Sequence, residues 1–301
     1  MSKPEISIII LSHNTKKITD RCLKSLNISI NFFTKETGES VELVVADNAS
    51  SDASEAMIQK KHSWVKLIKS TKNLGFAGGN NLGFKKTKGK YILLLNSDAF
   101  VKKETVYKAW RYLEKNSSVD VLGCKLKYKN GSFQPSGGYL PTPFRTSALM
   151  LGFDKMPIIK NIIKPIHPKV RIFFSAKNNL EWVMGAFMFM RRAVYRDTNG
   201  FDERFFMYTE EVEWCRRIQN KNFKLIYTPS FSVTHLGAAS SPDKTAPIIQ
   251  EAKGLIKYHQ KHYPNSVYLI KAVIKLGFIA RFILFSMLKD PRAKAYGKAL
   301  V

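Results

Sequence analysis

Cysteine is scarce in this sequence, and none of the patterns that give cysteine a structural role is present. The 301 residues include three cysteines, Cys22, Cys124 and Cys215, which are far apart, odd in number and without a Cys-x-x-Cys pair. Disulfide frameworks and zinc sites depend on even sets or paired spacings of cysteine. The sequence therefore excludes a disulfide-stapled domain, and a reducing compartment is the simplest setting for it.

Acidic residues are also few. The chain has 23 Asp and Glu against 49 Lys and Arg, which gives a formal net charge of +26. An excess of this size is larger than solubility requires and indicates a polyanionic partner. Nucleic acid, an anionic membrane surface and a phosphorylated substrate all fit that description, so the charge alone does not choose among them.

Two common nucleotide-binding signatures are missing. The sequence contains neither Gly-x-Gly-x-x-Gly nor Gly-x-x-x-x-Gly-Lys-Ser/Thr, which disfavours a standard dinucleotide-binding domain and a P-loop enzyme. The apolar run at 6–11 has six residues and is too short for the core of a signal peptide. We therefore expect the N-terminus to stay in the cytosol.

Short apolar runs alternate with helical patterns over the first hundred residues. The expected strands are 6–11, 42–46, 65–69 and 91–95, and the expected helices between them are 16–26, 53–61 and 77–86. Nearly continuous apolar strands joined by helices are typical of a parallel sheet that is covered on both faces. The pattern predicts an α/β fold with a Rossmann-like, mostly parallel sheet flanked by helices.

The second half of the chain has a less regular pattern. We expect a helix at 104–115, a strand at 119–128, a strand at 182–190, a helix at 210–220 and two short strands at 224–227 and 232–235. The stretch 135–168 contains six prolines and is expected to be a long irregular lid or acceptor loop. The predicted division is a main domain at 1–240, with halves 1–100 and 101–240, and a helical extension at 241–301.

The C-terminal stretch 267–288 is long and apolar enough that a transmembrane span must be considered. Its three cations, Lys271, Lys275 and Arg281, fall within one arc of about 120° at roughly 100° per residue. A basic stripe on an apolar helix suits a helix that lies in a membrane interface and is attracted to anionic headgroups. We expect that arrangement, with a helix packed on the protein and a buried span as the alternatives.

Polar clusters follow three of the expected strands. Ser12-His13-Asn14 follows the first, 47–52 follows the second and Asn96-Ser97-Asp98 follows the fourth. Ligands of open parallel sheets bind beyond the carboxyl ends of the strands. Asp98 is placed to hold Mg²⁺ or Mn²⁺ against a pyrophosphate, because these ions prefer oxygen ligands. The glycine-rich segment 73–81 opens a helix, whose N-terminus favours anionic oxygens.

These segments resemble a known family when they are taken in order. The strings are SIIILSHN (7–14), VVADNASSD (44–52), NLGFAGGNN (73–81), LNSD (95–98), GAFMFMRR (185–192), GFDERFF (200–206), EEVE (210–213) and HLG (235–237). The set resembles the family-2 nucleotide-sugar glycosyltransferases of GT-A fold, and within them the rhamnosyltransferase-like branch. The resemblance covers residues 6–240 and leaves the last sixty residues outside it.

The resemblance implies a donor site and a metal site. Asp47 would contact the nucleotide base, and Asp98 would be the metal-binding acid of an Asp-x-Asp motif that reads Asn96-Ser97-Asp98 here. His235 matches a position that helps to bind the metal or the diphosphate. The full set of donor-binding residues implied is Ser12, Asn14, Asp47, Asn48, Asn73, Gly78, Gly79, Asn80, Asn96, Ser97 and Asp98.

The resemblance also implies the catalytic residues. The family's general base is usually the Asp of a Glu-Asp pair, which reads Glu210-Glu211 here, so Glu211 takes that role. Without the family, 210–217 reads equally as an amphipathic helix with a Glu213–Arg217 ion pair. The acceptor or sugar pocket would contain Trp182, Gly185, Ala186 and Glu210.

The function implied is an inverting transfer of a sugar, with dTDP-L-rhamnose favoured as donor and UDP-hexoses open. The acceptor would be a glycan or a polyprenyl-diphosphate-linked glycan at the cytoplasmic face of the cell membrane. Apolar residues and cations in 155–171 and in the C-terminal helix would contact that membrane. The alternatives are a non-enzymatic nucleic-acid-binding protein, which the charge would favour, and a two-metal nucleotidyltransferase. The strand-tip acids argue against a nucleic-acid partner.

Overall fold

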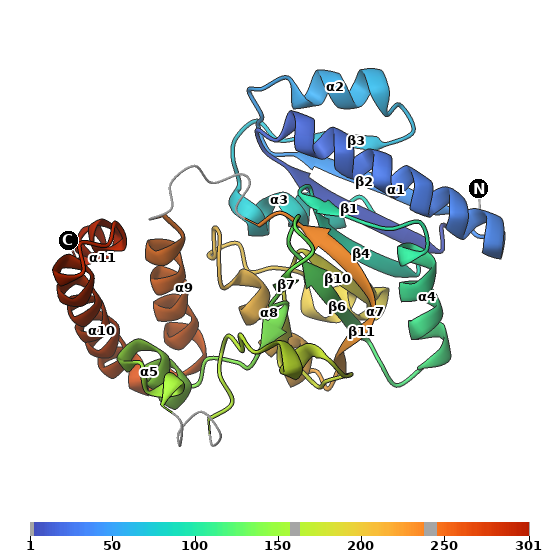
Figure 1. Cartoon of the computed structure of the whole chain (residues 1–301). Helices are drawn as coiled ribbons and strands as arrows, with labels where there is room; N and C mark the ends of the chain where they lie inside the picture. Colours follow the sequence, from blue (N-terminus) through green and yellow to red (C-terminus); the bar gives the residue numbers. More distant parts are fainter. Residues whose placement is uncertain (1–2, 157–162, 238–245, 301) are drawn as a thin grey trace.

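The computed structural model describes residues 3–156, 163–237 and 246–300 (Figure 1). Its first part is the predicted alternation of strands and helices. The strands are β1 (Ile6–Ser12), β2 (Val41–Asp47), β3 (Lys66–Lys69) and β4 (Tyr91–Asn96), and the helices are α1 (Lys16–Thr37), α2 (Ser54–Lys61) and α3 (Gly75–Phe84). The four strands are mutually parallel. The predicted strands and helices are confirmed, except that α1 continues eleven residues past its predicted end at residue 26.

The second part of the chain completes the same sheet. It supplies β5 (Ala99–Phe100), α4 (Thr105–Lys115), β6 (Val121–Lys127), β7 (Phe133–Gln134), β10 (Phe187–Arg191) and β11 (Leu225–His235). The strand order is β3-β2-β1-β4-β10-β6-β11-β5, with β7 paired to β6. β10 is antiparallel to both β4 and β6, whereas β11 is parallel to β6. The sheet is therefore mixed, with its parallel strands in the N-terminal half.

Three predictions in this part were wrong in detail. The single strand expected at 182–190 is divided into β9 (Trp182–Val183) and β10 by a turn, and the two strands expected at 224–235 are one strand, β11. The stretch 135–168 is not irregular throughout, since it contains β8 (Gly137–Gly138), which pairs with β9, and the helix α5 (Pro143–Leu151). Thr142 caps α5 through its hydroxyl, and Pro143 occupies the first helical position, where a missing N–H costs nothing. Residues 157–162 lie outside the described residues.

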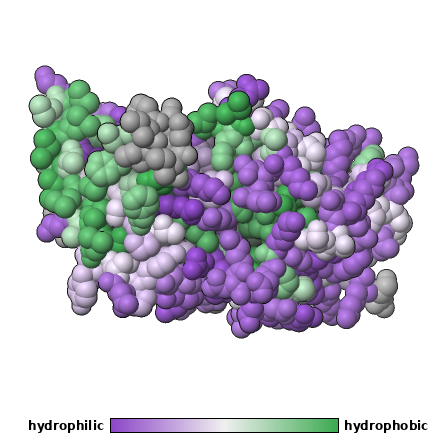
Figure 2. Space-filling model, turned by 90° about the horizontal axis from the view of Figure 1, so that it is seen from below, coloured by the Kyte–Doolittle hydropathy of each residue, from purple (hydrophilic) through white to green (hydrophobic). Residues whose placement is uncertain are grey.

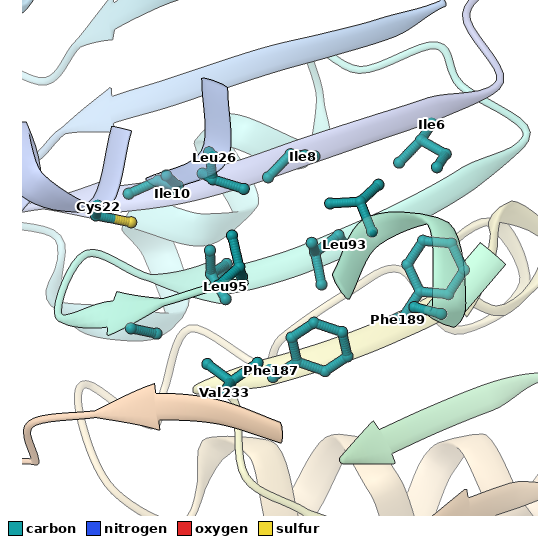
Figure 3. Close-up of a cluster of buried hydrophobic side chains, with 14 of the residues drawn as sticks. Ile6, Ile8, Ile10, Cys22, Leu26, Leu93, Leu95, Phe187, Phe189 and Val233 are labelled. Carbon is teal, nitrogen blue, oxygen red and sulfur yellow. The ribbon is translucent and has the colours of Figure 1, made fainter. Parts of the chain in front are cut away.

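The core lies on both faces of the sheet. Ile6, Ile8 and Ile10 of β1 point to the face covered by α1 and α4 (Figure 3), where they join a buried cluster that includes Leu26 and Phe189. On the opposite face Ile9 packs with residues of α3, of α7 (Arg192–Thr198) and of α8 (Glu210–Asn220). Burial on both faces explains why the parallel strands are apolar at almost every position.

Residues 238–245, which contain the predicted boundary at residue 240, lie outside the described part of the chain. Three helices follow them. They are α9 (Ala246–His262), α10 (Val267–Met287) and α11 (Arg292–Leu300), with a short 3-10 turn at Pro264–Ser266. They stand together with α5 beside the sheet domain (Figure 1). Tyr258 of α9 is fully buried in the same cluster as Ile9, on the face of the sheet covered by α3, α7 and α8. Helix α9 therefore packs against the sheet domain. Among the described helices, none is long and apolar enough to cross a bilayer.

The predicted basic stripe on α10 needs a correction. Lys271 and Lys275 are exposed, but Arg281 lies on the packed face of the helix. Its guanidinium donates hydrogen bonds to the Met150 carbonyl and, at 2.8 Å, to the Leu149 carbonyl at the C-terminal end of α5. A cation is favourable there, since the last carbonyls of a helix lack partners and carry partial negative charge. Arg281 thus joins α10 to α5 and is not part of an exposed stripe.

Candidate active site

The carboxyl ends of three neighbouring strands bring the predicted polar clusters to one edge of the sheet. Ser12 at the end of β1 pairs with Asp47 at the end of β2, and Leu11 pairs with Asn96 at the end of β4. Neighbouring strands lie about 4.8 Å apart. The three polar clusters therefore form one continuous edge, which the strand pattern predicted.

Asp47 is buried at this edge, with 3% of its surface exposed. Its Oδ1 accepts a hydrogen bond from the Ser50 N–H at 2.9 Å. Its Oδ2 is buried and has no hydrogen-bond partner among the described residues. Because an unpaired buried acceptor is costly, this oxygen is suited to accept a hydrogen bond from a bound ligand.

Asn48 and Asn73 shape the loop that leads into α3. Asn48 Nδ2 donates to Asn73 Oδ1 at 2.9 Å and to the Gly75 carbonyl at 3.1 Å, and Asn48 Oδ1 accepts from the Leu74 N–H at 2.9 Å. Asn73 Oδ1 also accepts from the Gly75 N–H at 2.8 Å. These two amides, predicted to bind the donor, use their polar groups to fix the loop, and any contact with a donor stays a prediction.

The glycines of α3 allow close packing. A Cβ on Gly79 would lie 2.3 Å from Leu11, and a Cβ on Gly78 would lie 2.9 Å from Leu74. Gly79 therefore lets α3 approach β1, which gives it a packing role in addition to the donor-binding role predicted. Asn80 donates to the Phe76 carbonyl at 2.9 Å, while its Oδ1 is buried and unpartnered in the described part of the chain. That oxygen is a second acceptor available to a ligand.

Asn14, Ser12 and Ser97 line the same edge. Asn14 has a left-handed backbone (φ 53°), and its Oδ1 accepts from the Ser51 N–H at 2.7 Å. Ser12 Oγ lies 3.2 Å from Thr19 Oγ1. Ser97 Oγ lies 3.4 Å from Thr15 Oγ1. These contacts connect the loop after β1 to the loops after β2 and β4.

Asp98 and His235 form a close pair at this edge. His235 Nε2 lies 3.2 Å from Asp98 Oδ1 and 3.3 Å from Asn96 Nδ2. The pairing of His235 with Ala99, between β11 and β5, holds the two segments in register. His235 Nδ1 lies 3.2 Å from Gln134 Oε1. When Nδ1 donates its hydrogen to that oxygen, Nε2 keeps the lone pair that a metal would bind.

The pair fits a divalent ion as a partial ligand set. Neighbouring ligands of an octahedral ion with bonds of about 2.1 Å lie roughly 3.0 Å apart, and the 3.2 Å between Asp98 Oδ1 and His235 Nε2 is close to that value. The residues that the structure describes contain no group of three or more His, Cys, Asp or Glu that could hold an ion. Diphosphate oxygens and water would therefore have to complete the coordination.

Glu210 and Glu211 begin α8. The two preceding residues, Tyr208 and Thr209, have left-handed backbones (φ 66° and 72°). Acidic residues in the first turn are favoured by the positive end of the helix dipole. Phe206, just upstream, accepts from the Phe76 N–H at 2.7 Å. This contact ties the segment before α8 to the start of α3 at the same sheet edge.

The two carboxyl groups have perturbed proton affinities. Burial, reinforced by the charge of Glu211, raises the pKa of Glu210 well above its ordinary value. Burial also raises the pKa of Glu211. The Oε2 oxygen of each is buried without a hydrogen-bond partner within the described ranges. A carboxylate with a raised pKa and a free oxygen has the properties of a general base.

Trp182, predicted to belong to the acceptor pocket, is buried, with 4% of its surface exposed. The Trp182 Nε1–H donates to the Ile166 carbonyl at 3.1 Å, and the ring meets His167 edge to face at 5.4 Å. The Ala186 carbonyl accepts from the Asn96 N–H at 3.3 Å, which places Gly185 and Ala186 beside the end of β4. A Cβ on Gly185 would meet the Phe76 ring at 3.1 Å. Gly185 and Ala186 thus lie against β4 and α3.

Two residues near Glu211 were missed in the sequence. His167 Nε2 lies 2.9 Å from Glu251 Oε1 on α9, and the charges of both act on the pKa of Glu211. No motif identifies Glu251, since it lies in an ordinary amphipathic helix beyond the resemblance. A Cβ on Gly254, one turn later, would lie 2.4 Å from Thr209 Oγ1, so α9 packs directly against the turn before the two glutamates.

Comparisons with known proteins bear on the family of this chain. The profile of the family described as Glycosyl transferase family 2 matches residues 7–198. The Rhamnosyltransferase WbbL of Escherichia coli is 27% identical over 240 residues, which cover 76% of this chain and 83% of the relative. The N-acetylglucosaminyl-diphospho-decaprenol L-rhamnosyltransferase of Mycobacterium tuberculosis is 21% identical over 252 residues. The match covers 78% of this chain and 77% of the relative.

Solved structures share the fold. The mannosyltransferase PcManGT of Pyrobaculum calidifontis, in complex with GDP-Man and Mn²⁺, has a TM-score of 0.57 at 15% identity and covers 99% of this chain and 74% of its own. Residues 1–349 of S. aureus TarS, in complex with UDP-GlcNAc, have a TM-score of 0.55 at 17% identity. The match covers 98% of this chain and 79% of the TarS chain. These likenesses confirm the predicted GT-A fold.

Both rival functions are disfavoured by these matches. A nucleic-acid-binding protein would explain the positive charge, and a nucleotidyltransferase would explain the acidic residues at the strand ends. Neither function explains a match to a glycosyltransferase profile over residues 7–198. The ordered motifs, the edge that joins them and the comparisons agree on one conclusion. This chain belongs to glycosyl transferase family 2 and is a glycosyltransferase with rhamnosyltransferase relatives.

Proposed function

We propose that this chain is an inverting glycosyltransferase that moves L-rhamnose from dTDP-L-rhamnose to a glycan or a lipid-linked glycan. The observation that carries the proposal is that Asp47, Asp98 with His235, and the start of α8 are all tied to the carboxyl edge of the sheet. The names of the two relatives favour rhamnose as the sugar. A UDP-hexose is the alternative donor.

The base of the donor would bind at Asp47. The free Oδ2 of Asp47 is a buried acceptor, and thymine and uracil each present an imide N–H that such an acceptor can bind. The same contact would serve a dTDP-sugar and a UDP-sugar. Asp47 therefore accounts for a pyrimidine base and leaves the choice of sugar to the pocket around Trp182.

The diphosphate would bind near Asp98. Asp98 and His235 would hold Mg²⁺ or Mn²⁺, which when bound offsets negative charge on the leaving nucleoside diphosphate. Asn96 supplies an uncharged amide where the family has an acid, so the protein contributes one negative charge at this point. An imidazole and a single carboxylate suit Mn²⁺ better than Mg²⁺.

Glu211 would remove the proton from the acceptor hydroxyl. Burial and the charge of Glu211 raise the pKa of Glu210 well above its ordinary value, which favours its neutral form and limits the negative charge beside the acceptor. Since the pKa of Glu211 is also raised, it is a stronger base than an ordinary carboxylate. A base of this kind contributes about 10²–10⁴-fold to the rate.

The acceptor would be glycan on a polyprenyl diphosphate at the cytoplasmic face of the cell membrane, where the protein would bind peripherally. The name of the mycobacterial relative contains such an acceptor. Support for a membrane contact comes from α10, whose apolar residues Tyr268, Leu269, Leu276, Ile283 and Met287 are 52–85% exposed. Figure 2 shows hydrophobic side chains gathered at the end of the molecule formed by the C-terminal helices.

The exposed apolar residues of α10 have the arrangement of an interfacial helix. At about 100° per residue they share an arc of roughly 100°, and the exposed Lys271 and Lys275 lie beside that arc. Apolar burial and attraction of these lysines to anionic headgroups would act together. The predicted second segment, 155–171, falls partly outside the described residues.

Vesicle binding tests the membrane contact. The double variant Leu269→Glu/Leu276→Glu should lose sedimentation with phosphatidylglycerol vesicles, because two carboxylates would enter the interface. The matched control is Ile28→Glu, which changes an exposed apolar residue on α1. Equal vesicle binding by the double variant and the wild type would refute the proposed face.

A thermal-shift panel tests the donor. The unfolding temperature is measured with UDP-, dTDP- and GDP-sugars, each with and without Mn²⁺, since a ligand that binds the folded state raises it. We expect the largest rise with dTDP-L-rhamnose and Mn²⁺. A larger rise with a UDP-hexose would establish the alternative donor, and no rise with any nucleotide sugar would refute the proposal.

A further inference from the structure

A second pocket lies beyond the predicted metal pair, at the far edge of the sheet. It has a volume of about 440 Å³ and is formed by the start of α4, the end of β6 and the middle of β11. Ligand pockets in proteins have volumes of roughly 300–1,000 Å³. The lining residues are Lys102, Lys103, Glu104, Thr105, Lys108, Lys125, Lys127, Pro229, Ser230, Phe231 and Ser232. We call this the lysine pocket.

The lysine pocket exists because β11 changes register. Thr228 pairs with Cys124 of β6, and the next pair along is Ser232 with Lys125. The three residues between them, 229–231, have no partner on β6 and bulge out of the ladder. Phe231 is 8% exposed and anchors the bulge in the core. The two serine hydroxyls on either side of Phe231 are left lining the pocket.

The charge of the lysine pocket is strongly positive. Five lysines and one glutamate line it, and Glu104 pairs with Lys108 one turn along α4. Lys125 and Lys127 are half-buried on β6. Within residues 3–156, 163–237 and 246–300, no carboxylate lies within 4.0 Å of the ammonium group of Lys102, Lys125 or Lys127. Several ammonium groups gathered in one pocket favour an anionic ligand.

The pocket is distinct from the donor's diphosphate site but close to it. Lys127 pairs with Thr234, the neighbour of His235. Lys102 follows Asp98 by four residues, so their Cα atoms are at most about 14 Å apart. The residues that line the lysine pocket include neither Asp98 nor His235. The lysine pocket is therefore a candidate site for an anionic group other than the donor's diphosphate.

We propose that the lysine pocket binds a phosphate or diphosphate group of the acceptor. The inference rests on the proposed function and adds the site at which the acceptor's phosphate binds. Lysine ammonium groups and serine hydroxyls are donors suited to phosphate oxygens. The one aromatic lining residue, Phe231, is buried, so the pocket offers no stacking surface for a nucleic-acid base.

Titration with inorganic pyrophosphate tests the proposal. Calorimetry is done on the full chain in EDTA, so that no divalent ion recruits pyrophosphate to Asp98. Lys125→Gln/Lys127→Gln removes two pocket cations, and Lys60→Gln/Lys61→Gln removes two exposed cations from α2 as the matched control. We expect the pocket variant to bind pyrophosphate at least tenfold more weakly than the wild type, and the control variant to bind it as the wild type does.

A second arm separates the two sources of phosphate. Both variants are sedimented with phosphatidylglycerol vesicles, and the proposal expects them to bind alike. If the pocket variant loses vesicle binding but keeps its pyrophosphate affinity, the lysines contact lipid headgroups and the proposal is overturned. Equal losses of pyrophosphate affinity in both variants would also overturn it, because diffuse charge would then explain the binding.

The donor measurement keeps the two hypotheses apart. Stabilisation by dTDP and Mn²⁺ is recorded for the wild type and both variants, and the proposal expects it to be the same in all three. If the wild type shows no such stabilisation, the proposed function fails, whatever the pyrophosphate result. If stabilisation is normal and the pocket variant keeps its pyrophosphate affinity, only the present inference fails.

Discussion

Replacing Glu213 by glutamine should destabilise the protein strongly at neutral pH. Glu213 lies on α8 with its side chain fully buried, and it accepts from Arg217 Nε at 3.0 Å and from Lys261 Nζ at 2.6 Å. His262 Nε2 lies 3.2 Å away. Lys261 and His262 belong to α9, so this carboxylate joins α9 to α8, only two residues along α8 from the predicted base Glu211.

The size of the expected loss in unfolding free energy depends on the hydrogen bonds that Lys261 and Arg217 keep. Removing one partner of a buried ion pair costs about 3–5 kcal/mol. Lys261 would still contact Asp202 Oδ2 at 2.7 Å, and Arg217 would still donate to the Gly200 carbonyl at 2.6 Å. We therefore expect the low end of that range for Glu213→Gln. Lys261→Met should cost less, about 1.5–3 kcal/mol, because Glu213 keeps Arg217.

The loss should depend on pH. Burial acts to raise the pKa of Glu213, but the His262 hydrogen bond and the Arg217 charge outweigh it, and the pKa is lowered. Because the pKa of Glu213 is lower in the folded state, Glu213 adds stability at any pH above its pKa in the unfolded state, which is about 4.3. This added stability is lost as the pH falls through the folded-state pKa. The difference between wild type and Glu213→Gln should therefore shrink below about pH 4.

Urea unfolding at pH 7 and at acidic pH measures these differences. The matched control is Asp197→Asn, which breaks an exposed pair with Arg196 and should change the stability little. If Glu213→Gln unfolds at the same urea concentration as the wild type at pH 7, the contact with α9 does not stabilise the fold and the reasoning is refuted.

Three further predictions concern the site. Asp47→Ala should weaken binding of dTDP about 10–100-fold by calorimetry, the loss of a charged hydrogen bond; unchanged affinity would place the base elsewhere. Asp98→Ala should abolish the extra thermal stabilisation that Mn²⁺ gives with dTDP, and a persisting Mn²⁺ effect would remove Asp98 from the metal site. Gly254→Val should lower both sugar transfer and unfolding temperature, because a Cβ there would meet Thr209 at 2.4 Å; wild-type values for both would show that α9 moves freely.

Sequence reasoning was reliable where one local pattern decided the structure. The apolar runs of β1, β2 and β4 fixed the parallel strands, and their polar ends predicted the edge that carries Asp47 and Asp98. It failed at the end of α1, where Asn27, Ile28 and Ser29 have low helix propensity. Burial of Ser29 and Phe33 on the core side overrides that propensity, and the helix ends only at Gly38, in a left-handed conformation.

The remaining features depend on contacts between distant segments. The role of Arg281 follows from its position over the end of α5, which a helical wheel of α10 cannot show. The pairing of His167 with Glu251 joins positions 84 residues apart. The lysine pocket needs the register change in β11, and the sequence of 224–235 reads there as two strands. The first two features depend on tertiary packing and leave no local signal, whereas the register change coincides with the break between the two predicted strands.

The role of Glu211 is the central chemical claim, and the transfer rate of Glu211→Gln tests it most directly. The wild-type rate should fall as the pH drops through the raised pKa of Glu211, because only the carboxylate can accept a proton. Glu211→Gln should bind the donor normally, lose about 10²–10⁴-fold in rate and lose this acid limb. Transfer at the wild-type rate with normal donor binding would contradict the account.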